Sequence, residues 1–508
     1  MLEKKRKRLL LINMEYSQDE VNEPINVDIL LALIPKDLFA PENTSLIYRD
    51  LSEDPPDEIR NSDIILISSK ISSYPKLQHI LDKCTGKLVI IGGILAIGAP
   101  EELATTFPDA VINTGEAETN IEILLRMAYL AKSVEEFKKI ILENHVNNVC
   151  FYLWETGKIY HSERVACKLI DYPFLEHNRV SDMVQRGGLI RMETSRGCPW
   201  NQCTFCIMPW KFCEKTWRSF SEGKIEAEIE HLIRNGADQI WFTDEDFIGN
   251  CDHLSMLCSI VERCNASHEK NIRYGGSTSV FTLLNLESAI DSLLQKMHDA
   301  GIKFIFIGIE SGSVSQLKRY NKGVTVEKNR QILAKLQQFK FEVDVGFIMF
   351  DADATMSELE ENLDFIEQNG LRRSISRFAK KLRVTPHTAL YDDYLQRGLI
   401  TSVLNLNELY YEYRFCDPTI ERITFYVEKL DRQVLMESYH LQAVLRSSRD
   451  PAETEWERTR LHELRDLGYQ FLRMCVNLYK QKNELSESDI QMIYDCCLNP
   501  GDGSYVYN

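Results

Sequence analysis

SRGCPWNQCTFC, residues 195–206, is the most informative stretch of this chain, because it holds Cys198, Cys203 and Cys206 in one short loop. Three thiolates at this spacing can bind three irons of a [4Fe–4S] cluster, and the fourth iron then has no protein ligand. An open iron can bind a substrate or a second cofactor, so the spacing favours chemistry over electron storage. A zinc knuckle or three packed thiols are the alternatives, but zinc sites usually pair their ligands and no second pair with a matching turn follows.

Length and composition set the class of protein. A chain of 508 residues predicts two or three domains, and 44% hydrophobic with 27% charged residues is typical of globular proteins. No apolar run approaches the length of a membrane span, and the start, MLEKKRKRLLLIN, lacks the features of a secretory signal. We therefore expect no membrane partner.

Charge and cysteine content narrow the class further. The net charge of −17 argues against a non-specific nucleic-acid binder, although a small local basic site stays open. Fourteen cysteines in a chain without an export signal indicate reduced thiols and a metal site rather than disulfides. The expected location is the cytoplasm.

Residues 1–130 show short apolar runs that alternate with helical patterns. This alternation predicts a doubly wound, Rossmann-like parallel sheet, in which ligands bind beyond the carboxyl ends of the strands. Glycines at such ends let a ligand approach the backbone, and hydroxyls can bond its polar rim; taken singly, each is also an ordinary turn residue. The expected strands are Arg8–Ile12, Ser45–Tyr48, Asp63–Ser68, Lys87–Ile91 and Ala110–Asn113. The candidate binding residues at their ends are Ser68, Ser69, Gly92, Gly93, Gly115 and Glu116.

A second α/β unit is expected at residues 188–395, after a connecting segment at 131–187 with a hairpin at Val149–Tyr160. Six βα units predict a partial parallel (β/α)6, TIM-like barrel, and such barrels work from the carboxyl ends of their strands. The cysteine loop follows the first strand directly. Residues 396–508 show helical periodicity and predict a helical C-terminal domain. The expected barrel strands are Leu189–Glu193, Gln239–Thr243, Ile272–Gly275, Lys303–Ile309, Val343–Met349 and Phe378–Val384.

The N-terminal part resembles a known cofactor-binding domain. The series IILISS, VIIGG, PEEL and VINTGEAE is similar to the cobalamin-binding domain at the N-terminus of many radical S-adenosylmethionine (SAM) enzymes. Domains that ligate cobalt from below carry an Asp-x-His-x-x-Gly turn after the first strand, whereas this chain reads NMEYSQDEVNEP there. The resemblance therefore implies cobalamin without a histidine below the cobalt.

The second unit resembles the cobalamin-dependent branch of the radical SAM superfamily. Its phrases TSRGCPW, CTFC, FTDEDF, FIGIESGS, VGFIMF and RVTPHTALY are similar, in order, to that branch's strand-end signatures. The resemblance implies that the three cysteines bind the cluster and that SAM chelates the open iron. It also implies SAM contacts for the residues at matching positions. These are Phe205 at the adenine, Asp244 and Glu245 at the amino group, and Glu310 and Ser311 at the ribose.

The spacing of the cysteines departs from the common pattern. Radical SAM loops usually read C-x3-C-x2-C, whereas Pro199 to Gln202 make this loop C-x4-C-x2-C. One extra residue in an irregular loop can bulge without moving the thiolates. Cys213 is an alternative fourth ligand, but it would close the iron that SAM needs, so we expect a packed thiol there.

The resemblance predicts a methyltransferase that acts on an unactivated carbon through a 5′-deoxyadenosyl radical and methylcobalamin. A radical SAM enzyme that uses cobalamin for a non-methylating rearrangement or cyclisation is one alternative. A catalytically degenerate corrinoid-binding or regulatory protein is another. For the enzyme we expect a small-molecule or peptide substrate and an external one-electron reductant such as flavodoxin or ferredoxin, with no nucleic acid.

Overall fold

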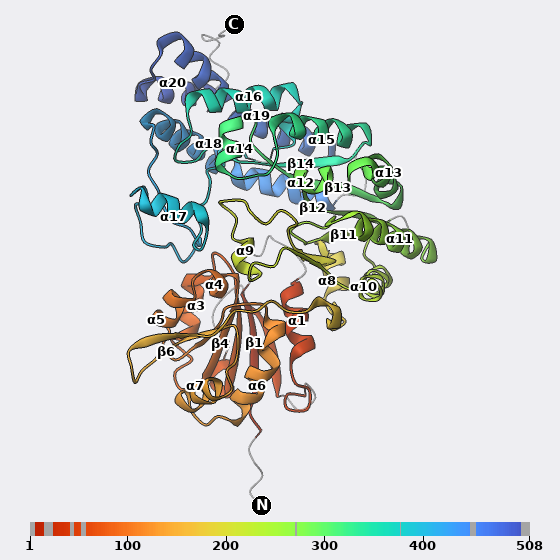
Figure 1. Ribbon diagram of the computed structural model, residues 1–508, viewed down its shortest axis with the longest axis vertical. Helices are drawn as coiled ribbons and strands as arrows, with labels where there is room; N and C mark the ends of the chain where they lie inside the picture. Colours follow the sequence, from red (N-terminus) through yellow and green to blue (C-terminus); the bar gives the residue numbers. More distant parts are fainter. Residues whose placement is uncertain are drawn as a thin grey trace, which may run out of the picture.

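The computed structural model describes residues 6–14, 24–40, 45–51, 57–269, 272–375, 377–447 and 454–498. Two large β-sheets and a helical region follow one another along the long axis of the molecule (Figure 1). Residues 15–23, which make up most of the segment NMEYSQDEVNEP, lie outside the described residues. Within the described part, no helix is both long enough and apolar enough to cross a bilayer.

The first sheet has the doubly wound form that the sequence predicts. Its five parallel strands lie in the order 2-1-3-4-5, with helices on both faces. Successive side chains of a strand point to opposite faces, so Leu9 and Leu11 pack in one core while Leu10 and Ile12 pack in the other. The strands are β1 (Leu9–Met14), β2 (Leu46–Leu51), β3 (Ile64–Ser69), β4 (Leu88–Gly93) and β5 (Val111–Asn113). The helices are α1 (Ile25–Leu33), α6 (Ile121–Leu130) and α7 (Val134–Glu143) on one face, with α3 (Tyr74–Leu81), α4 (Ile94–Gly98) and α5 (Pro100–Thr106) on the other, and α2 (Glu58–Asn61) is a short turn.

The hairpin expected in the connecting segment extends this sheet. Strands β6 (Val149–Leu153) and β7 (Lys158–His161) add antiparallel strands beside β5. Cys150 pairs with Ile112 and is fully buried in the same core. The first sheet thus continues past residue 130, where the sequence pattern suggested its end.

The second sheet contains five parallel strands in the order β14-β13-β12-β11-β8. The sixth strand expected at Phe378–Val384 is not formed: this segment meets β14's extension only through a parallel bridge between Phe350 and Lys381. Lys380, Lys381 and Arg383 interrupt its apolar run, which explains why a regular buried strand does not form. The strands are β8 (Ile190–Met192), β11 (Gln239–Phe242), β12 (Arg273–Ser279), β13 (Ile302–Glu310) and β14 (Glu342–Phe347).

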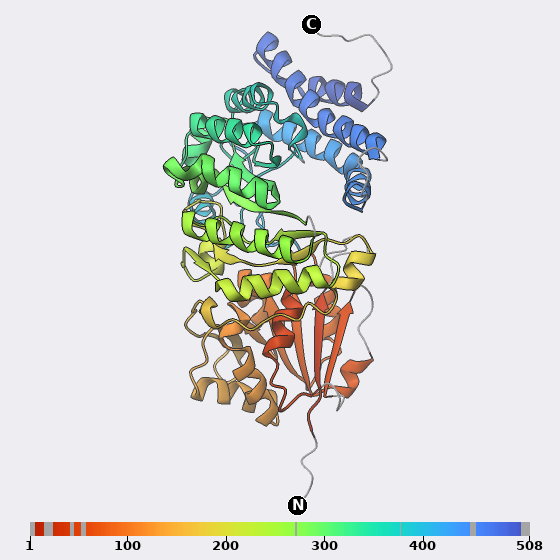
Figure 2. The ribbon, with the colours of Figure 1, turned by 90° about the vertical axis from the view of Figure 1, so that its right-hand side faces the viewer.

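Helices cover the outer face of the second sheet and continue into the C-terminal region. Figure 2 shows the helices of the second part as successive rungs between the first sheet and the blue C-terminal helices. In the second part they are α8 (Val180–Gln185), α9 (Met208–Lys211), α10 (Glu222–Arg234), α11 (Cys251–Ser267), α12 (Val280–Leu284), α13 (Ile290–Ala300), α14 (Val314–Arg319), α15 (Val326–Gln338), α16 (Met356–Gln368) and α17 (Ala389–Gln396). The C-terminal helices are α18 (Pro418–Ser447), α19 (Glu455–Lys482) and α20 (Glu487–Leu498), and α19 packs against α16.

Candidate functional site

The cysteine loop is closed at its base by two short strands that the sequence pattern did not reveal. Strand β9 (Ser195–Gly197) pairs antiparallel with β10 (Trp217–Ser219). Gly197 has φ +95°, and a Cβ there would lie 1.8 Å from the carbonyl oxygen of Thr216. The amide of Cys198 donates to that same oxygen at 3.1 Å. Only glycine lets the two strands come this close immediately before the first thiol.

The three thiols of the loop lie together in a half-buried position. Burial raises the pKa of Cys203 to about 12 and also raises those of Cys198 and Cys206. Within the described residues, no three metal-binding side chains converge on one ion. A [4Fe–4S] cluster does not need this, because each thiolate binds a different iron. Three thiols on one loop therefore fit the donor set of such a cluster.

A buried lysine, Lys322, lies near these thiols and belongs to no sequence motif. Lys322 is 8% exposed, and its Nζ donates to Glu310 Oε1 at 3.1 Å. Burial alone would lower its pKa, but Glu310 and the thiols of Cys203 and Cys198 outweigh this and raise the pKa. A fixed cation at this point stabilises negative charge on the loop. The sequence around Lys322 gives no sign of this role, and only the fold brings the residue close to the thiols.

The acidic residues that follow β11 divide into two kinds. Asp244 is buried and accepts from the Thr194 amide at 3.0 Å and from Ser195 Oγ at 2.6 Å. Burial raises the pKa of Asp244 to about 7, although these hydrogen bonds oppose the shift. Glu245 instead lies at the loop, where it accepts from Lys211 Nζ at 2.7 Å and from the Gly197 amide at 3.1 Å. Asp244 thus holds the base of the loop from the interior, and Glu245 is nearer the thiols.

Two other candidates of the second unit already have protein partners. Phe205 contacts the Tyr320 ring edge to face, with centroids 5.6 Å apart. Ser311 is fully buried, and its hydroxyl lies 2.6 Å from Gln316 Oε1 and 2.8 Å from Asn362 Oδ1. Glu310 at the end of β13 has φ +66° and reaches Lys322 as described. The contacts of these residues with SAM stay predictions.

The candidates at the strand ends of the first sheet have structural roles of their own. Ser69 Oγ donates to the Gly92 carbonyl oxygen at 2.6 Å, and Asn26 Nδ2 donates to Ser68 Oγ at 2.7 Å. Gly93 has φ +96°, and a Cβ there would lie 2.1 Å from the Ser69 carbonyl oxygen. A Cβ at Gly92 would meet only Asn113 Cβ, at 3.8 Å. Gly92 is therefore less crowded than Gly93.

Gly115 lies against a buried polar side chain. A Cβ at Gly115 would lie 2.6 Å from Asn148 Cγ. Asn148 is fully buried; its Nδ2 donates to Thr119 Oγ1 at 2.7 Å, and its Oδ1 accepts from the Val165 amide at 2.7 Å. This contact explains the glycine without a ligand, and cobalamin binding at Gly115 stays a prediction.

Glu116 belongs to a buried ionic network that joins the two sheets. Its carboxylate accepts from Arg196 at 2.8 Å and from Arg218 at 3.1 Å. Arg196 also donates to Glu118 at 2.8 Å and to Glu193 at 2.7 Å. Burial would raise the pKa of Glu116, but the charges of the two arginines outweigh it and hold the pKa at about 2. Glu116 is therefore ionised, and its visible partners are protein groups.

Helix α9, directly after the third cysteine, also contacts the first sheet's layer (Figure 1). Trp210 Nε1 donates to the Ile97 carbonyl oxygen at 2.9 Å. Its ring stacks on His387 with centroids 3.8 Å apart, and the Arg164 guanidinium lies 4.0 Å from its centroid. Arg164 Nε in turn donates to the carbonyl oxygen of Thr114, after β5. The carboxyl ends of the first sheet thus face the cysteine loop.

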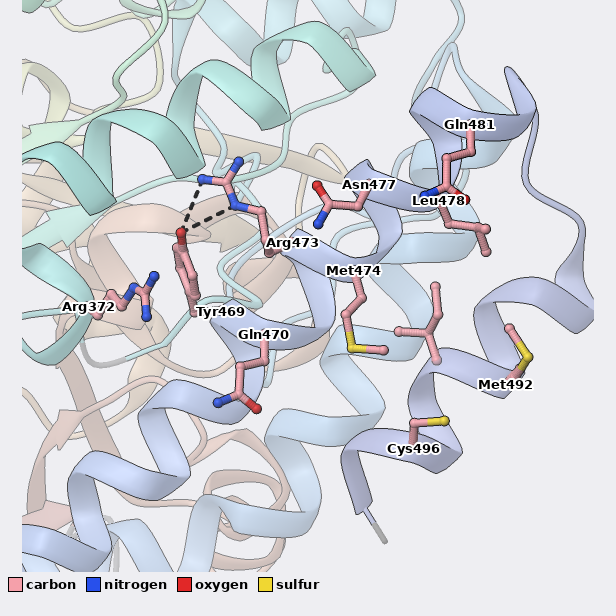
Figure 3. Close-up of a pocket in the computed structure, with 11 residues that line it drawn as sticks. Arg372, Tyr469, Gln470, Arg473, Met474, Asn477, Leu478, Gln481, Met492 and Cys496 are labelled. Carbon is pink, nitrogen blue, oxygen red and sulfur yellow. Dashed lines mark hydrogen bonds between the residues drawn. The ribbon is translucent and has the colours of Figure 1, made fainter. Parts of the chain in front are cut away.

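A large hollow lies elsewhere, in the C-terminal helices (Figure 3). It has a volume of ≈ 550 Å³ and lies between α19 and α20. Arg473 donates to Tyr469 Oη at 3.1 Å at one end, while Met474, Met492 and Cys496 line the other (Figure 3). None of the candidate residues lines this hollow, so the cavity does not identify the active site.

Known proteins match both the sequence and the fold. The radical SAM superfamily matches residues 192–366. The chain is 29% identical over 307 residues to 4'-phospho-dehydrooxetanocin synthase of Priestia megaterium, which covers 57% of the chain and 40% of that protein. It is 25% identical over 354 residues to bacteriochlorophyllide d C-8(2)-methyltransferase of Chlorobaculum tepidum, which covers 67% of the chain and 70% of that protein. The chain thus spans less than half the length of the first of these relatives.

Solved structures share the fold at low sequence identity. The cobalamin-dependent SAM radical enzyme OxsB, with aqua-cobalamin and SAM bound, superposes with a TM-score of 0.80 at 18% identity, covering 97% of this chain and 79% of OxsB. The radical SAM methyltransferase TsrM from Kitasatospora setae, with tryptophan and a SAM analogue bound, gives a TM-score of 0.60 at 13% identity, covering 94% of this chain and 99% of TsrM. The chain therefore contains a radical SAM domain at residues 192–366, and it resembles the cobalamin-binding radical SAM enzymes.

Proposed function

We propose that this protein is a cobalamin-dependent radical SAM methyltransferase that methylates an unactivated carbon. The observation that carries the proposal is the position of the three-thiol loop. It leaves the first strand of a parallel half-barrel and faces the carboxyl ends of a sheet with flavodoxin-like strand order. Ligands bind at that edge in both kinds of sheet. Two cofactor sites would then meet at one interface.

The chain's own residues would hold the cofactors and keep water out. Cys198, Cys203 and Cys206 would bind the cluster, with Lys322 as a fixed positive charge beside it. Gly92, where a Cβ would meet only Asn113 Cβ at 3.8 Å, would let a corrin ring approach the first sheet. When bound, cluster and SAM supply a carbon-centred radical that removes a substrate hydrogen, and cobalamin supplies the methyl group.

A second candidate function keeps the cofactors and omits the methyl transfer. It is favoured by the first relative named above, which is called a synthase rather than a methyltransferase. The structure with the TM-score of 0.80 is likewise called a radical enzyme. Under this candidate the chain would catalyse a rearrangement or cyclisation with cobalamin present. The substrate class, a small molecule or peptide, and an external one-electron reductant are part of both candidates, as is the cytoplasmic location.

Anaerobic reconstitution tests the proposal. Wild-type protein with iron, sulfide, cobalamin, SAM and a reductant should absorb visible light as a cluster does and should cleave SAM to 5′-deoxyadenosine. Cys203→Ala should lose both signals, whereas Cys416→Ala, at an exposed cysteine, should keep them. A wild type that shows no cluster and no cleavage would instead support the degenerate or regulatory protein. Once a substrate is known, product mass separates the two enzymatic candidates, because methylation adds one CH2.

A further inference from the structure

One short segment of the barrel contacts Trp200, Gln202, Thr204 and Phe205, which all lie between the first and third thiol. The segment is residues 319–323, which begins at the last residue of α14. The carbonyl oxygens of Arg319 and Tyr320 accept from Thr204 Oγ1 at 2.9 Å and from the Thr204 amide at 3.0 Å. The Tyr320 ring meets Phe205, as described above. The segment therefore fixes the part of the loop around the second thiol.

The same segment also holds the four-residue spacer between Cys198 and Cys203. Trp200 Nε1 donates to the Asn321 carbonyl oxygen at 2.6 Å. Asn321 Nδ2 donates to the Gln202 carbonyl oxygen at 2.8 Å. Asn201, between these two anchored residues, has φ +51°. A left-handed residue turns the chain sharply, so the spacer bulges between two fixed points instead of extending.

Gly323 completes the contact with Trp200. It has φ +72°, and a Cβ there would lie 2.7 Å from Trp200 Cζ2, so the indole packs directly on the backbone. The ring also contacts Phe281 of α12, with centroids 4.6 Å apart. Trp200 is thus held by a hydrogen bond and by packing on two elements of the barrel.

The segment is itself anchored in the barrel. Arg319 donates to Asp351 at 2.9 Å and to Glu358 at 2.7 Å. Tyr320 Oη donates to Asp351 Oδ2 at 2.7 Å, and Asp351 is 1% exposed. Charge-assisted hydrogen bonds to a buried carboxylate are short and directional. The surface on which the spacer lies is therefore rigid.

We infer that the 319–323 segment is the template for the cysteine loop, and that Asn321 and Trp200 are positioning residues that accommodate the extra residue between Cys198 and Cys203. Asn321 acts on the spacer through the Gln202 carbonyl oxygen, and Trp200 acts through its own anchored side chain. The inference rests on the proposed function in one respect: the proposed function supplies the cluster that the three thiols would bind. The contacts themselves require no cofactor.

Alkylation of the protein without iron tests the template directly. Full-length apo-protein is treated with iodoacetamide, and modification of each cysteine is followed by mass spectrometry. Asn321→Gly keeps the left-handed backbone of Asn321, φ +48°, and removes only the amide bond to the spacer. We expect Cys198 and Cys203 to react about fivefold faster, the factor that corresponds to one neutral hydrogen bond. Gln202→Ala is the matched control, because only its carbonyl oxygen is used and its side chain is exposed.

Buried Cys258 of α11 reports whether the barrel itself has opened. If Cys258 also reacts faster in Asn321→Gly, Trp200→Phe replaces that variant; it keeps an aromatic ring but loses the Nε1 bond and part of the packing on Gly323. Unchanged reactivity of Cys198 and Cys203 in a folded variant overturns the inference. These rates are measured without iron, so they stand or fall separately from the proposed function.

Iron content after reconstitution tests the consequence. Asn321→Gly should retain less iron and sulfide per chain than Gln202→Ala, and deletion of Asn201 should retain less still. The deletion restores the three-residue spacing, but Trp200 or Gln202 must then leave its contact with Asn321. A deletion variant with full iron content would show that the template does not set the spacing, and would overturn the inference.

Discussion

Replacing Glu116 by glutamine is the sharpest test of how the two sheets are joined. Glu116 contributes to folding as an ion, because the arginines hold its pKa at about 2 in the folded protein, against 4.5 without them. One pKa unit is worth about 1.4 kcal/mol, so the lowered pKa corresponds to about 3 kcal/mol at pH 7. The side chain is 4% exposed, so solvent does little to screen this interaction. Glu116→Gln should therefore lower the free energy of unfolding by about 3 kcal/mol at pH 7.

The sign of the pH dependence follows from the direction of the shift. A carboxyl group whose pKa is lowered on folding stabilises the protein above its unfolded pKa, and this contribution is lost as pH falls towards the folded pKa. For Glu116 the loss begins near pH 4.5 and is complete near pH 2. The contribution falls from about 3 kcal/mol at pH 7 to about 2 kcal/mol at pH 3.5. The deficit of Glu116→Gln should shrink by the same amount.

Urea unfolding at the two pH values measures both effects. The matched control is Glu122→Gln, which removes an exposed ion pair with Arg126 and should cost less than about 1 kcal/mol. Circular dichroism and tryptophan fluorescence should be followed together, because a chain with two sheets need not unfold in one step. If Glu116→Gln costs no more than Glu122→Gln, or costs the same at pH 7 and pH 3.5, the ionic explanation is refuted.

Two further predictions concern single buried positions. Gly115→Ala should lower the free energy of unfolding by about 1–3 kcal/mol in thermal or urea unfolding, because the new Cβ would overlap Asn148. The control is Gly223→Ala, which should be neutral or stabilising because no atom lies within 4 Å of its Cβ. Equal stabilities of the two variants would contradict the packing argument. Because folding raises the pKa of Asp244, its contribution to stability is fully present below about pH 4 and is lost as pH rises through about 7. In unfolding curves measured over this pH range, Asp244→Asn should abolish the decline in stability. An unchanged decline would show that another group causes it.

The sequence predicted strands β1, β3 and β5 of the first sheet because they are buried on two sides. Ile64–Ile67 is a continuous apolar run, and every residue of the strand Ile64–Ser69 is buried. The expected sixth barrel strand failed for the converse reason, since Lys380 and Lys381 break the run. The hairpin of β9 and β10 was missed because its three-residue strands carry arginine and serine instead of apolar residues. Short polar strands leave no periodic signal.

The candidate site was predictable in its metal ligands and less so in its surroundings. Cys198, Cys203 and Cys206 lie within nine residues of one another, so their spacing alone identifies them as candidate metal ligands. Lys322 lies more than a hundred residues further along and has no motif, so only the fold brings it to the thiols. Glu116 follows a strand end as a ligand-binding residue would, but its partners are Arg196 and Arg218. Pairing over such separations cannot be read from local pattern.

Strand β9 connects the ionic network to the cysteine loop, because it holds Arg196 and is followed directly by Cys198. Arg196 lies two residues before Cys198, and the intervening Gly197 is locked by its contact with Thr216. A buried ion pair is weak evidence for stability, because apolar residues of similar size often do as well. It is directional, however, and Arg196 contacts Glu116 and Glu118 of the first sheet's layer. The strand that leads into the first thiol is thus oriented directly against the strand ends of the first sheet, whereas an apolar contact would leave it free to slide.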